Sequence, residues 1–338
     1  MQLVLALSDL IALADDEAAA RRAPALARLL AAAGIPAVED GAMGTALASR
    51  YGVQRQADWP LAPIRLAALG IDPGEAFWLG ADPVTLVVGR DDIRLGGIVD
   101  DLGRTDADAL VETLNRHFAD DGVLFAAPRP DAFFVRVERP PRISTQPLAT
   151  ASGGSLRAPP IAGPEADTWQ RWQSEIQMLL HEHPVNLRRE NEGRPPANSL
   201  WFSCGGTLPV RSGREPSIRT FANSGIAAAL AAHAGSPARE VPARLAPALD
   251  AAAGAEVVVV ALDAPLDPAS VDGAWAAPAF DALASGRLAS VSLLTDVAGW
   301  VAAWRARRPG VWQRLAGRYA RHDLAALLAA ARSVGRSG

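Results

Sequence analysis

The sequence contains no lysine and a single cysteine, Cys204, among its 338 residues. One cysteine excludes a disulfide framework within the chain and fits a reducing compartment, so we expect a cytoplasmic protein with a buried, inert thiol. The formal net charge of −4 argues against a nucleic-acid partner, because such a surface needs concentrated basic charge. Arginines do cluster near the end of the chain, where we expect a solvated helix face: Arg305, Arg307, Arg308, Arg314, Arg318 and Arg321.

Long apolar runs are missing as well. No stretch of membrane-spanning length is free of charge or proline, and the first ten residues lack the basic leader of a signal peptide, so we expect a soluble protein without a membrane partner. The sequence contains neither a P-loop nor a dinucleotide fingerprint nor an HExxH motif. With 49% hydrophobic and 21% charged residues, the chain is globular and can bury a substantial core.

Short apolar runs alternate with helical patterns along much of the chain. Leu3 to Leu7, Glu256 to Leu262 and Leu288 to Leu294 are typical of buried strands, and Ala18 to Ala33 has helical periodicity. Strands that alternate with helices predict an α/β fold with a mainly parallel sheet and helices on both of its faces.

A different pattern interrupts this alternation. Asp106 to Phe118 predicts an amphipathic helix, and Val123 to Ala127 and Phe133 to Val137 predict two strands joined by a tight turn. The segment 139–165 is rich in Pro, Gly and Ser and reads as a connection back to the main body. We therefore expect a core made of 1–84 and 166–338, with 85–165 forming a smaller inserted α+β module.

An aspartate follows each of three predicted strands: Asp9, Asp263 and Asp296. Ligands of parallel sheets bind outside the carboxyl ends of the strands, and converging carboxylates suit a divalent ion such as Mg²⁺ or Mn²⁺. The alternative interpretation is that each aspartate caps a helix or forms a turn.

The segment from Thr168 to Pro209 holds much of the polar chemistry. Its helical pattern stops at Pro184, and a polar run then leads to an apolar strand and a Gly-Gly pair. Arginine forks and asparagine amides suit phosphate or carboxylate, and glycines allow a ligand to approach the backbone. This pattern predicts an anion-binding corner for a small phosphorylated or carboxylated metabolite, made by His183, Asn186, Arg188, Arg189, Asn198, Gly205 and Gly206.

The alternative for this polar run is structural. Arg and Glu in such a segment usually form a solvated loop with local ion pairs, each worth about 0.2–1 kcal/mol. A metal site at His181 and His183 is disfavoured, because residues two apart point to different sides of a helix.

Several motifs resemble known families. Leu66–Pro73, Asp106–Asn115 and the run HPVNLRRENEGRPPANSLWFSCGG are similar to the archaeal-type 2,3-bisphosphoglycerate-independent phosphoglycerate mutases of the alkaline phosphatase superfamily. The segment WQSEIQMLLHEHPVNLRRENEGRPPANSLW resembles the signature of the RpfE-type regulatory proteins, a related group. The resemblance implies an alkaline-phosphatase-like core with a smaller insert, and it places Asp9 at a metal-binding position.

The chain departs from the mutase pattern at its reactive positions. Where the resemblance implies a nucleophilic serine, the sequence has Leu61, Ala62 and Arg65. Asp267 and Val297 stand where it implies metal-binding histidines. A serine nucleophile and two metals need those groups, so mutase chemistry should be lost.

Three functions follow from these patterns. The first is a degenerate, non-catalytic mutase-like protein that binds a small anionic ligand in a regulatory role. The second is an active metal-dependent mutase or phosphatase whose site has been rebuilt with carboxylates. The third is an interaction protein without a small ligand. The sequence leaves the identity of the ligand and the oligomeric state open.

Overall fold

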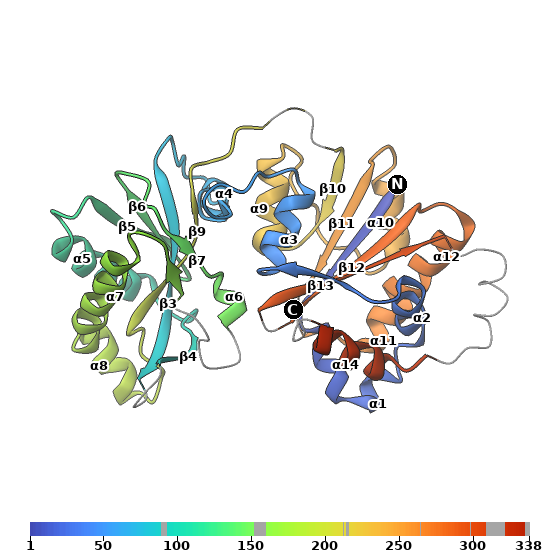
Figure 1. Cartoon of the computed structure of the whole chain (residues 1–338), viewed down its shortest axis with the longest axis horizontal. Helices are drawn as coiled ribbons and strands as arrows, with labels where there is room; N and C mark the ends of the chain where they lie inside the picture. Colours follow the sequence, from blue (N-terminus) through green and yellow to red (C-terminus); the bar gives the residue numbers. More distant parts are fainter. Residues whose placement is uncertain are drawn as a thin grey trace. The chain divides into compact units, whose positions relative to one another are not determined.

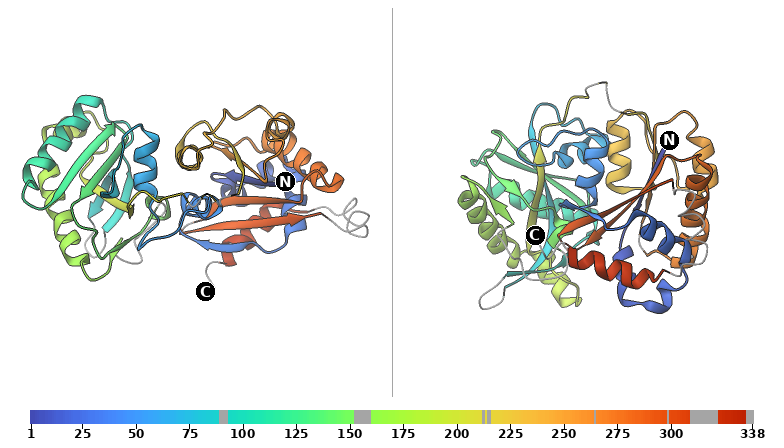
Figure 2. Two further views of the ribbon diagram at one scale, coloured as in Figure 1. Left: turned by 90° about the horizontal axis from the view of Figure 1, so that it is seen from above. Right: turned by 45° about the vertical axis from the view of Figure 1, so that its right-hand side comes forward.

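The computed structural model describes residues 1–88, 93–151, 160–211, 213, 216–263, 265–297, 299–308 and 322–334. The chain forms two compact units, shown in Figure 1. Unit 1 consists of Met1–Gly52 and Arg211–Gly338, and unit 2 consists of Val53–Val210. Figure 2 gives two further views of the same strands and helices.

Unit 1 is built on a six-stranded mixed sheet, sheet A. Its strands, in spatial order, are β10 (Ile218–Phe221), β11 (Val257–Leu262), β1 (Gln2–Leu7), β12 (Ser290–Val297), β13 (Trp300–Arg307) and β2 (Ala37–Asp40). The first four run parallel, whereas β13 is antiparallel to both of its neighbours. The α/β prediction is confirmed in this coarse form: the sheet is mostly parallel, with antiparallel pairing at one side.

The helices of unit 1 cover both faces of sheet A. They are η1 (Leu10–Asp15), α1 (Glu17–Ala20), α2 (Pro24–Ala33), α3 (Met43–Arg50), α9 (Gly225–His233), α10 (Leu245–Ala251), α11 (Pro268–Val271), the π-helical turn η2 (Asp272–Ala276), α12 (Ala277–Ser285) and α14 (Leu324–Val334). Buried side chains of α2, α10, α12 and α14 form one core with alternate residues of the central strands, among them Leu5, Val260 and Leu293. The other face carries α3 and α9, and Tyr51 next to α3 hydrogen-bonds Thr220 of β10 (2.5 Å).

The start of α2 shows how distant elements define a helix end. Pro24 occupies the first helical position, where its missing N–H costs nothing. The Leu26 N–H in the first turn of α2 has a partner that is distant in sequence: it donates a hydrogen bond to the buried carboxylate of Asp272 at 2.7 Å. The π-helical turn therefore fixes where α2 begins.

Unit 2 is an α+β unit around an antiparallel sheet, sheet B. Its strands are β3 (Phe77–Val88), β4 (Ile93–Ile98), β5 (Val123–Arg129), β6 (Ala132–Val137) and β9 (Ser199–Gly206), and a short separate pair is β7 (Ser144–Thr145) with β8 (Ile161–Ala162). The helices are α4 (Leu61–Ala68), α5 (Arg104–His117), α6 (Leu148–Ala151), α7 (Ala166–His181) and α8 (Pro184–Asn191). The long strand β3 pairs with β9 on one side and with β6 and β4 on the other.

Two layers of side chains hold unit 2 together. Trp169 and Ile176 of α7 pack with Phe133 and Phe202 on one face of sheet B, in a core that α5 completes. On the other face, α4 packs on Trp78 and Phe134. The polar segment expected in the main body thus belongs to unit 2.

The boundaries of the two units lie outside those expected for the insert. The sequence predicts breaks at 85 and 165, and both fall within unit 2. Strand pairing accounts for the difference, since Val84 of β3 lies opposite Ser199 of β9. Because these residues share one sheet, segments on either side of 85–165 join the same unit.

Some local expectations need correction. Arg305 and Arg307 lie in β13 rather than in a terminal helix, because this segment pairs antiparallel with β12. The other arginines expected on that helix, apart from Arg308, fall outside the described residues. Across the described residues, no helix combines the length and apolar character needed to cross a bilayer.

Candidate functional site

The carboxyl edge of sheet A brings the three predicted aspartate positions together. Strands β11, β1 and β12 are neighbours, with Leu7 level with Leu262 and Ala6 level with Leu294. Asp263 directly follows β11, Asp9 comes two residues after the end of β1, and Asp296 lies one residue before the end of β12. All three positions therefore lie at one edge, as the parallel-sheet prediction requires.

Asp9 adopts an uncommon backbone conformation there. Its φ of 58° lies in the left-handed region, which aspartate tolerates better than most residues but which still stores strain. It precedes η1, yet its carboxylate makes no capping hydrogen bond to that turn. The Asp9 side chain is exposed at the sheet edge.

Asp296 has a structural partner. Its carboxylate accepts a hydrogen bond from the Met43 N–H at 2.9 Å and so caps the start of α3. Burial raises the pKa of Asp296, the Met43 hydrogen bond counteracts this increase, and the nearby negative charge of Asp9 adds to it. The negative charge of Asp9 is therefore felt at Asp296, where burial is the main cause of the raised pKa.

Asp263 borders a cavity of about 280 Å³ at the ends of β10 and β11. The cavity is lined by both polar and apolar groups, including Asn223, Leu266 and Trp275. Asp267 also lines it, but its carboxylate accepts hydrogen bonds from the Ser270 N–H and hydroxyl and pairs with Arg22, so this residue caps α11.

These residues do not fit a divalent-metal site as they stand. Within the described part of the chain, no group of three or more His, Cys, Asp or Glu side chains is arranged to hold a metal ion. One oxygen of Asp296 is already used by the Met43 N–H, and Val297 offers no ligand. Mg²⁺ or Mn²⁺ binding at Asp9, Asp263 and Asp296 thus stays a prediction without a complete ligand set.

The predicted anion-binding residues all lie in unit 2. The first two, His183 and Asn186, hydrogen-bond backbone groups at helix ends. His183 caps α8: its Nδ1 accepts from the Val185 N–H (3.3 Å), and its Nε2 contacts the Thr113 hydroxyl (3.1 Å). Burial lowers the pKa of His183, which favours the neutral ring. Asn186 is fully buried; its amide donates to the carbonyls of Leu180 and Ala197 and accepts from the Ala197 N–H.

The two arginines of the predicted corner are held by carboxylates. Arg188 pairs with Asp106 of α5 at 2.5 Å. Arg189 is 1% exposed, pairs with Asp101 at 2.6 Å and donates from Nε to the Pro195 carbonyl. Hydrogen bonds from Arg194 and then from Arg189 lower the pKa of Asp101, which stays ionised between them.

The remaining predicted residues, Asn198, Gly205 and Gly206, lie where β9 packs against β3. Asn198 bonds both the N–H and the carbonyl of Leu86 in β3 (2.7 and 2.9 Å). Gly205 and Gly206 lie within β9 and not in a turn after it. A Cβ atom at Gly205 would lie 3.0 Å from Phe77 and Leu79, so close packing of β9 on β3 explains this glycine.

The predicted corner therefore has a structural interpretation that the sequence could not distinguish from ligand binding. Its polar groups connect α8, β9, α5 and β3 to one another. An anion would have to compete with Asp101 or Asp106 for the guanidinium groups of Arg189 or Arg188. Binding at this corner stays a prediction, and the ion-pair alternative now has named partners.

The positions that the mutase resemblance assigns to the nucleophile lie at the start of α4. Leu61 and Ala62 are buried apolar residues in its first turn. Arg65 pairs with Asp82 of β3 at 3.1 Å, and its guanidinium lies over the ring of Phe134. These contacts hold α4 on sheet B.

Sequence patterns missed a buried polar cluster beside α4. The carboxylate of Asp58 accepts hydrogen bonds from the N–H and hydroxyl of Thr145, and that hydroxyl accepts one from the Cys204 N–H. Cys204 has a positive φ of 57°, and burial raises its pKa to about 12. The thiol is therefore unreactive as a nucleophile at neutral pH, as expected from the sequence.

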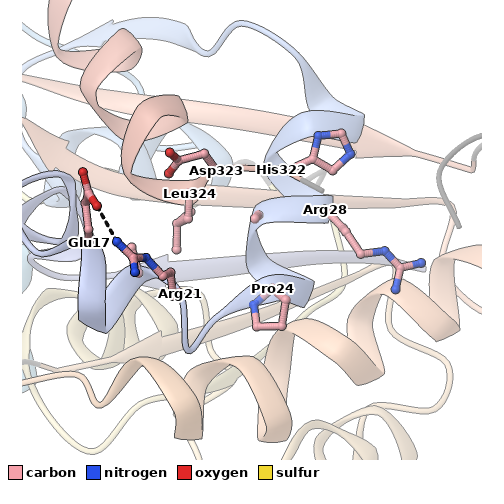
Figure 3. A pocket seen from close by; sticks show the side chains of 9 residues that line it. Glu17, Arg21, Pro24, Arg28, His322, Asp323 and Leu324 are labelled. Carbon is pink, nitrogen blue, oxygen red and sulfur yellow. Dashed lines mark hydrogen bonds and ion pairs between the residues drawn. The ribbon is translucent and has the colours of Figure 1, made fainter. Parts of the chain in front are cut away.

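A larger hollow of about 460 Å³ lies in unit 1 among α1, α2 and the start of α14. Figure 3 shows Glu17 and Arg21 on one side of it and Arg28 and His322 on the other. Arg21 pairs with Glu17, and Arg28 stacks over the Phe280 ring at 4.2 Å. These two guanidinium groups already have partners, which makes the hollow a weak candidate for an anion site.

A mostly parallel sheet in one unit and an antiparallel α+β unit define a mixed α/β protein of two units. No protein-family model matches the chain, and neither does any curated protein sequence. Among solved structures, the PH0037 protein from Pyrococcus horikoshii is similar, with 14% identity and a TM-score of 0.50 over 90% of this chain and 87% of that one. The cofactor-independent phosphoglycerate mutase from Thermoplasma acidophilum matches with 18% identity and a TM-score of 0.44, over 90% of this chain and 89% of the mutase.

At these identities the comparison concerns the fold alone. The match to the PH0037 protein extends over nearly the whole of both chains and supports a related fold. The RpfE-type resemblance and the roles of individual residues stay predictions.

We expect Gly205→Ala to lower the free energy of unfolding by about 1–3 kcal/mol, because the new methyl group would overpack Phe77 and Leu79. Gly273→Ala is the matched control, since a Cβ atom there meets open space. Urea denaturation of both variants measures the difference. Equal stability of the two would show that Gly205 is not required for strand packing and would favour a ligand-related role.

Asp296→Asn should change how stability depends on pH. Because the pKa of Asp296 is raised above its ordinary value of 3.8, its contribution is complete below that value and is lost as pH rises through the raised pKa. Asparagine keeps an oxygen for the Met43 N–H and cannot ionise. The variant should therefore gain stability relative to the parent protein between about pH 4 and pH 7, as followed by urea denaturation; a difference independent of pH would contradict the assignment.

Proposed function

We propose that this protein is a mutase-like protein without phosphoryl-transfer activity that binds a small phosphorylated or carboxylated metabolite in a regulatory role. The observation that supports it most is the first turn of α4. Where the sequence resemblance expects a nucleophilic serine, Leu61 and Ala62 bring buried apolar side chains. Neither can attack phosphorus, and Arg65 next to them is held by Asp82.

The metal-binding positions support the same proposal. Phosphoryl transfer of this type needs ions held at fixed geometry to stabilise developing negative charge. Asp267 stands where an imidazole is expected, yet it caps α11 and pairs with Arg22. The side chain of Val297 provides no ligand atom, so neither position supplies the imidazole that the resemblance implies.

The abundance of arginine residues supports anion binding. The basic residues of the chain are all arginine, whose planar fork matches carboxylate and phosphate oxygens. Arg188 and Arg189 have carboxylate partners, which compete with a ligand. Arg211 and Arg219 of unit 1 have no such partner among the described residues and line a cavity of their own.

An active metal-dependent mutase or phosphatase is the second candidate. Two features of the carboxyl edge favour it: the strained backbone of Asp9 and the raised pKa of Asp296, to which Asp9 contributes. Strain and like-charge pairs are concentrated at functional sites, and a divalent ion between these two carboxylates would relieve their repulsion.

Purified protein supplied with 3-phosphoglycerate and Mn²⁺ should show no turnover above the uncatalysed background, because Leu61 and Ala62 occupy the positions that the resemblance assigns to the nucleophile and no metal-ligand cluster is arranged among the described residues. A coupled assay for 2-phosphoglycerate measures this. Asp263→Ala distinguishes true activity from a contaminant. Mn²⁺-dependent turnover that disappears in this variant would contradict the non-catalytic proposal and establish the second candidate.

A metabolite that binds should stabilise the folded protein. At a concentration about 100 times its dissociation constant, a phosphorylated or carboxylated ligand adds about 2.7 kcal/mol to the free energy of unfolding. Thermal-shift screening detects this stabilisation. Arg188→Gln tests the predicted corner: an unchanged shift would exclude it as the site, and a screen without any shift would favour an interaction protein.

A further inference from the structure

A second cavity lies at the edge of sheet A opposite to the three aspartates. It has a volume of about 420 Å³ and is bounded by the approach to β10 and by the turns after α9 and α10. Its polar lining comes from Arg211, Ser217, Arg219 and Ser236, and the rest is made of small or apolar residues. Because β10 runs parallel to β11 and β1, the second residue of β10, Arg219, lies at the amino end of the sheet.

Arg219 is built into the wall of this cavity. Its Nη1 donates a long hydrogen bond, 3.4 Å, to the hydroxyl of Ser236. Its Nε is buried and has no hydrogen-bond partner within the described part of the chain. Buried donors on charged groups are nearly always satisfied in folded proteins, so this N–H calls for an acceptor.

Arg211 lines the same cavity. Its guanidinium lies directly over Gly235, where a Cβ atom would collide with Nη1. Gly235 has a φ of 74°, and the absence of a side chain leaves room for the arginine beside Ser236. Two guanidinium groups and a hydroxyl thus border one small space.

Neither arginine is neutralised by a carboxylate among the described residues. Other arginines of unit 1 have such partners: Arg50 pairs with Glu39 at 2.6 Å, and Arg287 pairs with Asp250. Two unpaired like charges near each other repel, and a shared anion removes that repulsion.

Helix ends provide an alternative reason for positive charge here. Both α9 and α10 end near the cavity, and carbonyl groups at helix ends favour cations. Arg239 does serve this purpose, since it donates to the Ala251 carbonyl at 3.4 Å. The helix ends do not, however, provide an acceptor for the Arg219 Nε.

We infer that this cavity binds the phosphate group of a small metabolite between Arg211, Arg219 and Ser236. The inference rests on the proposed function, because it names the site and the chemical class of the regulatory ligand. A dianionic phosphate has enough oxygens to accept from both guanidinium groups and from the Ser236 hydroxyl. The site is separate from the carboxyl edge where mutase-type chemistry would take place.

The test measures binding of inorganic phosphate to the full chain by isothermal titration calorimetry at low ionic strength. Arg211→Gln removes an exposed charge and should not prevent folding, and Arg219→Gln removes the buried one. Gly235→Ala keeps both charges but places a methyl group where the Arg211 guanidinium lies. Each variant should weaken phosphate binding by about tenfold or more, the effect of losing one charge-assisted contact.

Arg136→Gln is the control, because this exposed residue of β6 lies in unit 2 and its loss changes the net charge equally. Undiminished affinity in this control, together with weakened affinity in the three variants, supports the site. Equal affinity in the parent protein, Arg211→Gln and Gly235→Ala overturns it and leaves the proposed function intact, with its ligand bound elsewhere. Malonate in place of phosphate distinguishes carboxylate recognition: tighter binding of malonate would overturn the assignment to phosphate.

Discussion

The parallel pairing of β1 with β11 and β12 is the constraint on which unit 1 depends. β1 comes from the beginning of the chain and the other two strands from its last third, and their register brings Asp9, Asp263 and Asp296 to one edge. The same pairing buries alternate strand residues against α2, α10, α12 and α14. A parallel sheet covered by helices cannot shift its register without exposing that core, so the edge geometry is fixed by packing and not by the aspartates.

At the same edge, two carboxylates have structural roles at helix ends. Asp296 caps α3, Asp267 caps α11, and Asp9 keeps a strained backbone without a capping hydrogen bond. In unit 2 most groups of the polar run pair with one another, although the buried Nη1 of Arg189 has no hydrogen-bond partner among the described residues. Asn186 and Arg189 are almost completely buried, and a buried amide or guanidinium without partners would be costly. Carboxylate, amide and guanidinium side chains that suggest a binding site in the sequence therefore serve as helix caps and ion-pair partners in the structure.

Sequence periodicity was informative wherever burial is one-sided or continuous. It predicted the strands before Asp9 and Asp263, the helix α5 and the end of α7 near Pro184, because these patterns reflect local geometry. Periodicity gave the wrong prediction where secondary structure depends on pairing with a distant strand. Arg305 and Arg307 lie in β13 because β12 pairs with them, and β9 joins unit 2 because it pairs with β3 from Trp78 to Val84. The arginine cavity had no sequence signal, since Arg211, Arg219 and Ser236 meet only when three turns come together.

The sequence by itself determined the mixed α/β class and the aspartates at the ends of parallel strands, because each depends on residue type and local spacing. The tertiary structure alone decided which charges are neutralised. Arg189 and Asp101 lie 88 residues apart and form an ion pair, whereas Arg219 has no carboxylate partner among the described residues, and its buried Nε has no hydrogen-bond acceptor there. Charge neutralisation depends on distances across the fold, which no local pattern contains.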